Sequence, residues 1–292
     1  KWNVKVENLS LKYGNQTALD RLSFTLDDEK IYGLIGRNGA GKTSLLSIIA
    51  SFREQTEGTL TIAGETPFEN RRIMQQVAFY YSRDFKEDSE TVKEVIDDTE
   101  RYRPNFDRDC AMKLVERFQL PLKKKVKDLS KGMQSALNAT LGLASRAPIT
   151  IFDEVYVGMD APTRDIFYKE VLNEQANYPR IMIISTHLVS EMDYLFDEIL
   201  ILHQGRLLLQ EDYETIVSKG ATITGAKTDV DDFVRGKKVI QTEELGNTKQ
   251  VMILGNLSED ERKEANKMGL EVGSVTLQDL FIHLTKEDGA NE

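Results

Sequence analysis

The chain has 292 residues, of which 40% are hydrophobic and 29% are charged, a composition typical of a globular protein with an ample core. Its formal net charge of -10 argues against broad binding of nucleic acid, because such binding depends on neutralising phosphates. The single cysteine, Cys110, cannot form a disulfide within the chain, which favours a reducing compartment.

No apolar run approaches the ~20 residues that a membrane-spanning helix needs; the runs at 181–184 and 199–202 are strand-sized. The basic run 123–127 is interpreted as a solvated loop rather than a binding patch. No signal peptide is recognised. Because the chain starts at Lys1 without a Met, its native first residues are expected to be missing or replaced.

In chain order, residues 2–30 are predicted to form paired β-strands around a turn at Gly14 and Asn15, because apolar and polar residues alternate on both sides of it. The apolar run 31–35 predicts a strand, and the apolar segment 44–50 predicts a helix.

Between that strand and that helix lies the sequence GRNGAGKT, a complete G-x-x-x-x-G-K-[ST] phosphate-binding loop. Its glycines let successive backbone N–H groups curl round the β- and γ-phosphates, and the helix N-terminus adds positive potential. Lys42 supplies a point charge, and the Thr43 hydroxyl can ligate Mg²⁺. The alternative, a chance glycine-rich turn, is disfavoured by the strand–loop–helix context. The residues predicted to bind nucleotide here are Gly36, Asn38, Gly39, Ala40, Gly41, Lys42, Thr43 and Ser44.

The middle of the chain alternates between strand and helix patterns, which implies a mostly parallel sheet. The pattern over about 89–144 is helical, and the continuous apolar run 149–152 is typical of a buried parallel strand. The other predicted elements are strands 58–64, 77–81, 181–185 and 198–202, helices 163–177 and 188–195, and a hairpin over 205–210.

Asp153 and Glu154 follow the apolar run 149–152, which places two carboxylates at the carboxyl edge of the sheet beside the phosphate loop. We expect Asp153 to hold Mg²⁺, directly or through water, and Glu154 to polarise the water that attacks the γ-phosphate. The alternative is a pair of acidic residues that caps the next helix. The order of strand, loop and carboxylates disfavours it.

After about residue 212 the pattern changes. Apolar runs at 239–240 and 251–254 flank Gly246 and Asn247, a predicted hairpin turn. Residues 258–268 predict a capped amphipathic helix, 270–275 a strand and 277–284 a final helix. We therefore predict a first domain over residues 1–211 and a small α+β accessory module over 212–292.

Further motifs surround the phosphate loop and the carboxylate pair. The segment LSKGM at 129–133 lies between them, GMD at 158–160 and STH at 185–187 follow, and Tyr13 lies upstream. With these motifs in this order, residues 2–211 resemble the ATP-binding cassette (ABC) ATPases. The resemblance implies a P-loop NTPase cassette of the α/β class: a mostly parallel sheet core, an antiparallel β subdomain and a helical subdomain at about 89–144.

The resemblance also implies a mechanism. Two cassettes close head to tail over two ATP molecules, and Ser130 and Gly132 of one complete the γ-phosphate site of the other. Tyr13 stacks on adenine, Asp160 belongs to the D-loop, Glu154 activates water, and His187 contacts the γ-phosphate. Lys42, Mg²⁺, His187 and the LSKGM segment of the partner stabilise the negative charge that develops on the γ-phosphate.

The implied role is that of an ATPase subunit that uses ATP and Mg²⁺ to power export of a peptide, antibiotic or similar amphiphile. Its expected partners are a second ABC ATPase, identical or different, and a separately encoded ABC-2-type transmembrane permease subunit. Its expected place is the cytoplasmic face of the cell membrane. One alternative is a soluble ATP switch of the same superfamily. The other, a scaffold without turnover, is disfavoured by the presence of Lys42, Asp153, Glu154 and His187.

The sequence departs from the family pattern twice. Lys131 and Met133 replace the Gly and Gln of the common LSGGQ signature, as in bacterial exporters with a separate ABC-2-type membrane subunit. Ser82 stands where a glutamine that contacts Mg²⁺ and signals to the membrane subunit is expected. Either Ser82 or Asp84 substitutes through water, or the coupling differs.

The strand and helix predicted at the end of the chain also resemble a segment of known proteins. Residues 274–285 resemble the tail of peptide, antibiotic and acetoin-operon exporter ATPases of Gram-positive bacteria. The alternative is a packing helix that folds back on the cassette or on the partner subunit.

Overall fold

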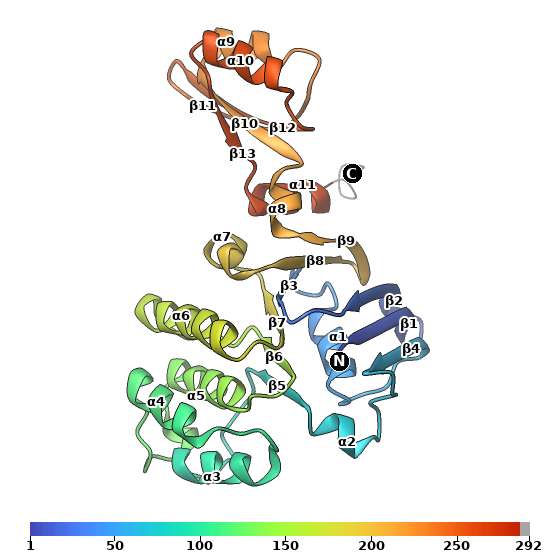
Figure 1. The fold of residues 1–292 in the computed structure, drawn as a ribbon, viewed down its shortest axis with the longest axis vertical. Coiled ribbons are helices and arrows are strands. Elements are labelled where there is room, and N and C mark those ends of the chain that lie inside the picture. The colour runs from blue at the N-terminus through green and yellow to red at the C-terminus, as the bar shows by residue number, and fades with distance from the viewer. Residues whose placement is uncertain (287–292) are drawn as a thin grey trace. The chain divides into compact units, whose positions relative to one another are not determined.

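The computed structural model describes residues 1–286, so residues 287–292 of the predicted accessory module lie outside the described part. The chain divides into two compact units (Figure 1). The first comprises residues 1–188 and 194–210, and the second comprises residues 189–193 and the chain from residue 211 onward.

The first unit is built on a six-stranded sheet in the order β5-β6-β7-β3-β8-β9. Strands β5, β6, β7, β3 and β8 run parallel to one another, as the alternation of elements predicts. Every residue of β3, β6 and β7 is buried, because both faces of this sheet are covered. The strands are β3 (Ile31–Ile35), β5 (Val77–Tyr81), β6 (Ile149–Asp153), β7 (Ile181–Thr186), β8 (Glu198–His203) and β9 (Arg206–Asp212).

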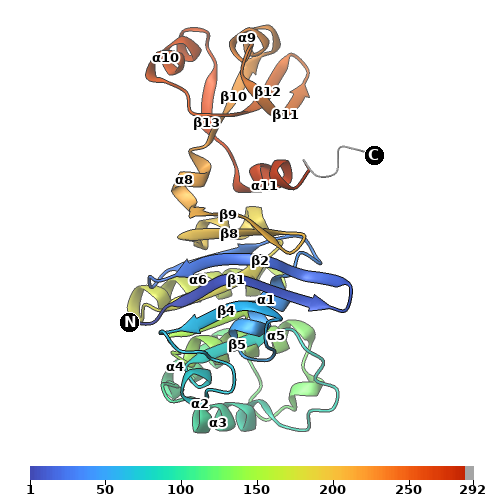
Figure 2. The ribbon, with the colours of Figure 1, turned by 90° about the vertical axis from the view of Figure 1, so that its right-hand side faces the viewer.

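An antiparallel sheet in the order β2-β1-β4 forms the second layer of this unit, and Figure 2 shows its strands side by side. Strands β1 (Val4–Tyr13) and β2 (Gln16–Leu26) form the predicted hairpin, with Tyr13 paired to Gln16 across the turn. Strand β4 (Glu57–Ile62) pairs with the other edge of β1. The antiparallel β subdomain expected from the family resemblance is therefore confirmed.

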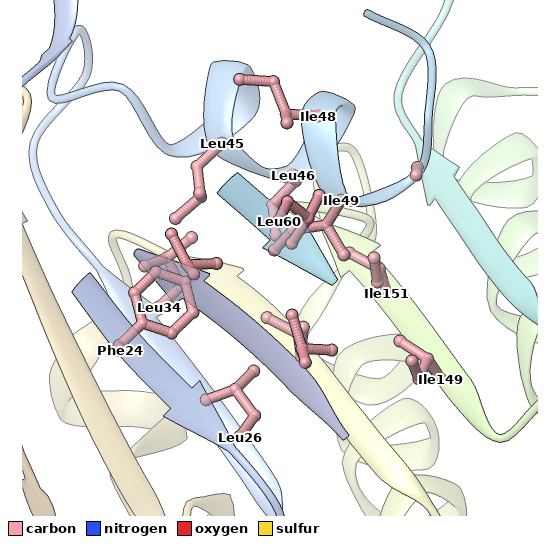
Figure 3. Close-up of a cluster of buried hydrophobic side chains, with 14 of the residues drawn as sticks. Phe24, Leu26, Leu34, Leu45, Leu46, Ile48, Ile49, Leu60, Ile149 and Ile151 are labelled. Carbon is pink, nitrogen blue, oxygen red and sulfur yellow. The ribbon is translucent and has the colours of Figure 1, made fainter. Parts of the chain in front are cut away.

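Helix α1 (Lys42–Ile49) is fixed by the core that joins the two sheets (Figure 3). Burying a Leu or Ile side chain contributes about 1.5–3 kcal/mol, so this cluster holds the start of α1 firmly in place. The loop before α1 is held with it. The cluster includes Leu45, Leu46 and Ile49 of α1, Phe24 and Leu60 of the antiparallel sheet, and Leu34 and Ile151 of the parallel sheet.

The predicted helical stretch 89–144 consists of three α-helices and a 3-10 turn at residues 126–128. Helix α5 packs so closely on β6 that a Cβ at Gly142 would lie 2.2 Å from the Phe152 ring. Side-chain oxygens of Thr91 and Asp107 cap α3 and α4. The helices of the first unit are α1, α2 (Arg71–Met74), α3 (Val92–Tyr102), α4 (Arg108–Phe118), α5 (Lys131–Ala144) and α6 (Ala161–Asn177).

The second unit is an α+β fold around an antiparallel sheet in the order β11-β12-β10-β13. Gly246 adopts φ +62° in the predicted hairpin turn, and Ser258 and Glu261 form a capping box. Its core includes Ile223, Val251 and Leu270. The strands are β10 (Gly220–Ala226), β11 (Lys238–Leu245), β12 (Thr248–Leu254) and β13 (Glu271–Ser274); the helices are α7 (Val189–Met192), α8 (Tyr213–Val217), α9 (Lys227–Phe233), α10 (Glu259–Lys267) and α11 (Leu277–Lys286).

Three elements of this unit were not predicted from sequence: α8, β10 and α9. The sequence of β10, GATITGA, has too few large apolar residues for a clear alternation, although β10 is a central strand paired to both β12 and β13. Within residues 1–286, every helix is too short or too polar to span a bilayer.

Candidate nucleotide site

The loop at residues 36–43 connects β3 to α1, and its backbone requires glycine at several points. Gly39 and Gly41 have φ +85° and +106°, in the left-handed region that favours glycine. A Cβ at Gly36 would lie 2.7 Å from the carbonyl oxygen of Leu202. Gly41 is the N-cap of α1 and offers no side chain to the first N–H groups of the helix, so they are available to an anion.

Lys42 lies across this loop with only 6% of its surface exposed. Its ammonium group donates a hydrogen bond to the carbonyl oxygen of Gly36 and lies 3.3 Å from Oε1 of Glu154. The charge of a buried lysine is costly unless it is paired. In this structure Glu154 supplies the opposite charge.

Asp153 joins the loop to the central sheet. The Thr43 hydroxyl donates to Oδ2 of Asp153 at 2.8 Å, and the Ser185 hydroxyl donates to Oδ1 at 2.5 Å. These side chains offer only oxygen atoms, the ligands that Mg²⁺ prefers. Among the described residues, no group of three or more His, Cys, Asp or Glu could hold a metal by itself.

Glu154 follows Asp153 in a left-handed backbone conformation, with φ +51°. Such a conformation is uncommon for a non-glycine residue and clusters at functional sites. Oε1 of Glu154 lies 3.0 Å from Nδ1 of His187, whose side chain is 44% exposed. The structure thus brings together Lys42, Glu154 and His187, the three residues that the sequence nominated for catalysis.

Tyr156 and Ser185 belong to this cluster and were missed by the sequence analysis. The buried Tyr156 phenol lies 3.2 Å from Nδ1 of His187 and from the Thr186 hydroxyl, and burial raises its pKa to about 12. Tyr156 stands two positions after Glu154, and Ser185 is the first residue of the STH motif at 185–187, although the sequence analysis assigned it no role. That proximity is the one signal that could have found them.

A pocket of about 460 Å³ opens over the phosphate loop, a size typical of small-molecule sites. Tyr13 lies at its edge, half-exposed, with the Arg53 guanidinium 5.4 Å from the ring centre. Of the predicted residues of the phosphate loop and the catalytic cluster, Gly36, Ala40, Asp153 and His187 do not line it. The predicted residues that line it are Tyr13, Asn38, Gly39, Gly41, Lys42, Thr43, Ser44 and Glu154, and the lining residues not predicted are Gln16, Thr17, Ala18, Arg37, Gln204 and Gly205.

Ser130, Gly132 and Asp160 do not line this pocket. The Ser130 hydroxyl caps α5 by accepting from the Met133 N–H at 3.2 Å. A Cβ at Gly132 would lie 2.6 Å from the carbonyl oxygen of Gly158. Asp160 caps α6 and accepts from the Thr163 N–H at 2.9 Å; the hydrogen bonds from Thr163 hold the pKa of Asp160 below its ordinary value.

A larger hollow of about 1000 Å³ lies elsewhere on the first unit, along α4 and α6. Charged side chains in its lining pair with one another, Arg117 with Glu170 and Arg146 with Glu174. No residue of the predicted site lines it. We therefore take the smaller pocket as the candidate site, because its lining includes a phosphate-binding loop.

Residues 19–157 match the family model described as ABC transporter. Over 89% of this chain and 89% of the relative, the chain is 28% identical to ABC transporter ATP-binding protein YtrB of Bacillus subtilis. It is 27% identical to the lantibiotic transport ATP-binding protein SrtF of Streptococcus pyogenes, over 72% of this chain and 91% of SrtF. It is 29% identical to the bacitracin transport ATP-binding protein BcrA of Bacillus licheniformis, over 70% and 68% of the two chains.

Solved structures share the fold of this chain. One, titled the structure of an ATP-binding subunit of an ABC transporter, superposes with a TM-score of 0.64 at 22% identity, over 80% of this chain and 92% of that one. Another, the dimeric post-hydrolysis state of the ATP-binding cassette MJ0796 bound to ADP and Pi, has a TM-score of 0.61 at 19% identity, over 72% and 98%. The α/β cassette fold predicted from sequence is confirmed.

Proposed function

We propose that this chain, which belongs to the ABC transporter ATPases, hydrolyses ATP to power export through separately encoded membrane subunits. The observation that carries the proposal is the 2.8 Å contact between Thr43 and Asp153. It joins the phosphate loop to the carboxylate pair at the edge of the parallel sheet, which is the arrangement that phosphoryl transfer requires.

In the proposed reaction, the loop N–H groups and Lys42 bind the phosphates of ATP, while the Tyr13 ring stacks on the adenine. Lys42 then faces phosphate oxygens in place of the Glu154 carboxylate, which lies 3.3 Å away in this structure. Glu154, released from Lys42, orients and polarises the attacking water. His187 contacts the γ-phosphate as charge develops. Catalysis is positioning together with electrostatic stabilisation.

We propose Mg²⁺ as the cofactor, held by the Thr43 hydroxyl and by Asp153 directly or through water. Bound there, the ion would neutralise charge on the β- and γ-phosphates. The Ser185 hydroxyl, which donates to the other carboxylate oxygen of Asp153, fixes the orientation of that carboxylate.

We further propose that two cassettes act together, as a homodimer or as a heterodimer with a second ABC ATPase. On the family resemblance, we assign Ser130, Gly132 and Asp160 to the site of the partner; they do not line the pocket of their own chain. The dimeric state of the similar cassette MJ0796 with ADP and Pi supports the same reading.

The export role rests on the relatives, whose names assign SrtF to lantibiotic transport and BcrA to bacitracin transport. We propose a peptide, an antibiotic or a similar amphiphile as the exported substrate and an ABC-2-type permease subunit as the membrane partner. The chain would then act at the cytoplasmic face of the cell membrane. Residues 1–211 would be the cassette, and residues 212–292 an accessory module.

The ATPase is tested with purified chain, by measuring phosphate release with and without Mg²⁺. We expect hydrolysis that EDTA abolishes and that Asp153→Asn lowers by at least about a hundredfold, because the ion loses its protein carboxylate. The control is Asp165→Asn, an exposed carboxylate on α6 that pairs with Lys169. If neither EDTA nor Asp153→Asn lowers the rate of hydrolysis, the assignment of a Mg²⁺-dependent ATPase is wrong.

The export role is tested by purifying the tagged chain from native membranes and identifying the integral membrane protein that accompanies it. The expected result is one permease that remains bound in detergent and raises the ATPase rate. A chain that hydrolyses ATP but is recovered without any membrane protein would favour the soluble ATP switch.

A further inference from the structure

Tyr156 is a buried side chain beside the candidate site to which the proposed reaction assigns no task. Its phenol oxygen lies 3.2 Å from each of three atoms: the Thr186 hydroxyl, the His187 backbone nitrogen and Nδ1 of the His187 ring. The rings of Tyr156 and His187 meet edge to face with their centres 5.9 Å apart. Tyr156 thus fixes both the backbone and the ring of His187.

The direction of these hydrogen bonds follows from the groups involved. The His187 backbone N–H can only donate, so the phenol oxygen accepts from it. The Thr186 hydroxyl accepts from the Leu188 N–H at 2.8 Å and donates its own hydrogen to the phenol oxygen. The phenol hydrogen is therefore available for Nδ1 of His187. With its pKa raised to about 12 by burial, the phenol keeps that hydrogen at neutral pH.

Nδ1 of His187 has a second neighbour, Oε1 of Glu154, at 3.0 Å. A carboxylate can only accept, so a bond to Glu154 requires a hydrogen on Nδ1, whereas a bond from Tyr156 requires a bare Nδ1. A neutral imidazole carries one hydrogen on its two nitrogens. The partner of Nδ1 therefore decides whether Nε2 accepts or donates.

We propose that Tyr156 is a positioning residue that selects the tautomer of His187 during the ATPase cycle. Without nucleotide, Nδ1–H of His187 donates to Glu154 and Nε2 is bare. When Glu154 turns to the attacking water, the Tyr156 hydroxyl donates to Nδ1, and the histidine hydrogen moves to Nε2 by exchange with solvent. Nε2–H is then the donor that meets the γ-phosphate. This inference rests on the proposed function, because it assigns Tyr156 a role through His187.

The property to measure is the tautomer of His187, because a merely structural role of Tyr156 would not change it. The chain has three histidines, so ¹⁵N-histidine labelling gives a simple spectrum, and His187→Ala identifies the His187 signals. With Mg²⁺ and a non-hydrolysable ATP analogue, we expect the parent to change from the Nδ1–H to the Nε2–H form. Tyr156→Phe should keep Nδ1–H or populate both forms. If His187 of the parent chain keeps the Nδ1–H form when the analogue is bound, the proposal is wrong, and no variant is needed to show it.

Kinetics provide the second readout. We expect Tyr156→Phe to lower kcat about 10- to 100-fold, at or below the smallest effect typical of a positioned acid–base group, because Tyr156 acts through His187, with little change in KM for ATP. The matched control is Tyr32→Phe, which removes another buried hydroxyl, one that bonds the Asp28 backbone at 3.1 Å and does not line the pocket. This control should keep the parent kcat.

Two failures are distinguishable in these experiments. A parent chain that neither binds the analogue nor hydrolyses ATP contradicts the proposed function. A parent that hydrolyses ATP while Tyr156→Phe matches it in kcat and in tautomer contradicts the role of Tyr156 alone.

Discussion

Glu154 occupies the left-handed backbone region at the end of β6, where its carboxylate lies between Lys42 and His187. Both contacts involve the same oxygen, Oε1, at 3.3 Å and 3.0 Å. A carboxylate held in this way is preorganised beside the phosphate loop, but it must exchange partners before it can polarise water. At the scale of single residues, this exchange is the step on which the proposed chemistry depends.

Glu154→Gln is expected to abolish turnover while ATP binding is retained, and to trap a closed dimer. The amide keeps the size of the side chain but loses the group that polarises water, so kcat should fall by about 10²–10⁴. The measurements are steady-state ATP hydrolysis and the nucleotide-dependent oligomeric state. Glu116→Gln, an exposed position on α4, is the control, and near-parent hydrolysis by Glu154→Gln would contradict the assignment.

Tyr13→Ala is expected to weaken ATP binding and to leave kcat nearly unchanged. Tyr13 is 49% exposed at the edge of the pocket, where its ring is available to adenine, and base–aromatic stacking contributes about 1–3 kcal/mol. The affinity in a nucleotide titration should fall about 5- to 150-fold. Tyr102→Ala removes a comparably exposed ring outside this pocket and should have no effect. Equal affinities of Tyr13→Ala and parent would contradict the stacking role of Tyr13.

At the scale of elements, the end of β5 is where the chain departs from its family. Ser82 is exposed and does not line the nucleotide pocket, while the residue before it is fixed because Asn138 of α5 donates to the Tyr81 carbonyl at 3.1 Å. The rings of Phe79 and Tyr81 lie 5.0 Å apart along the same strand. The strand end is therefore tied to α5 by the hydrogen bond between Asn138 and the Tyr81 carbonyl.

Ser82→Ala is expected to leave the basal ATPase of the isolated chain unchanged and to reduce its stimulation by the membrane partner. The reason is geometric: a short hydroxyl can reach the metal site only through water. Hydrolysis is measured with and without the reconstituted partner for Ser82→Ala and Ser82→Gln, with the exposed Ser89→Ala as control. If both substitutions at residue 82 leave stimulation intact, coupling does not pass through this position.

At the scale of the whole molecule, each unit has its own buried cluster of apolar side chains. The first unit is also held by a buried ion network centred on Glu174 of α6. Its carboxylate accepts from Arg180 at 2.6 Å and from Arg146 at 3.0 Å, and Arg180 also donates to the Leu143 carbonyl of α5. Burial lowers the pKa of Arg180, while the Glu174 carboxylate opposes that shift.

Glu174→Ala is expected to destabilise the first unit by about 3–5 kcal/mol, because it leaves Arg180 buried without its carboxylate. The measurement is the midpoint of urea unfolding. Asp165→Ala on the same helix breaks an exposed pair with Lys169 and should cost no more than about 1 kcal/mol. Equal midpoints for the two variants would mean that the buried network adds no stability.

The sequence by itself determined the features that depend on neighbouring residues. The phosphate loop could be predicted because its glycines, Lys42 and Thr43 are contiguous, and their conformation is set by local φ angles and by the helix that follows. Strand β6 and its terminal carboxylates could be predicted because a short apolar run bounded by charge is a local pattern. The order of these motifs then predicted the cassette fold.

Only the tertiary structure decided which distant groups meet. Ser185 reaches Asp153 across 32 positions, and Tyr156 reaches His187 across 31, so neither contact has a local signature. Strand β10 was missed for the same reason, since pairing with β12 and β13 defines it more than its own glycine-rich sequence does. Local motifs depend on short-range sterics and on the periodicity of the sequence, so they can be recognised without the fold. Tyr156 and Ser185 acquire their roles from long-range packing, which brings β6 and β7 side by side in one sheet.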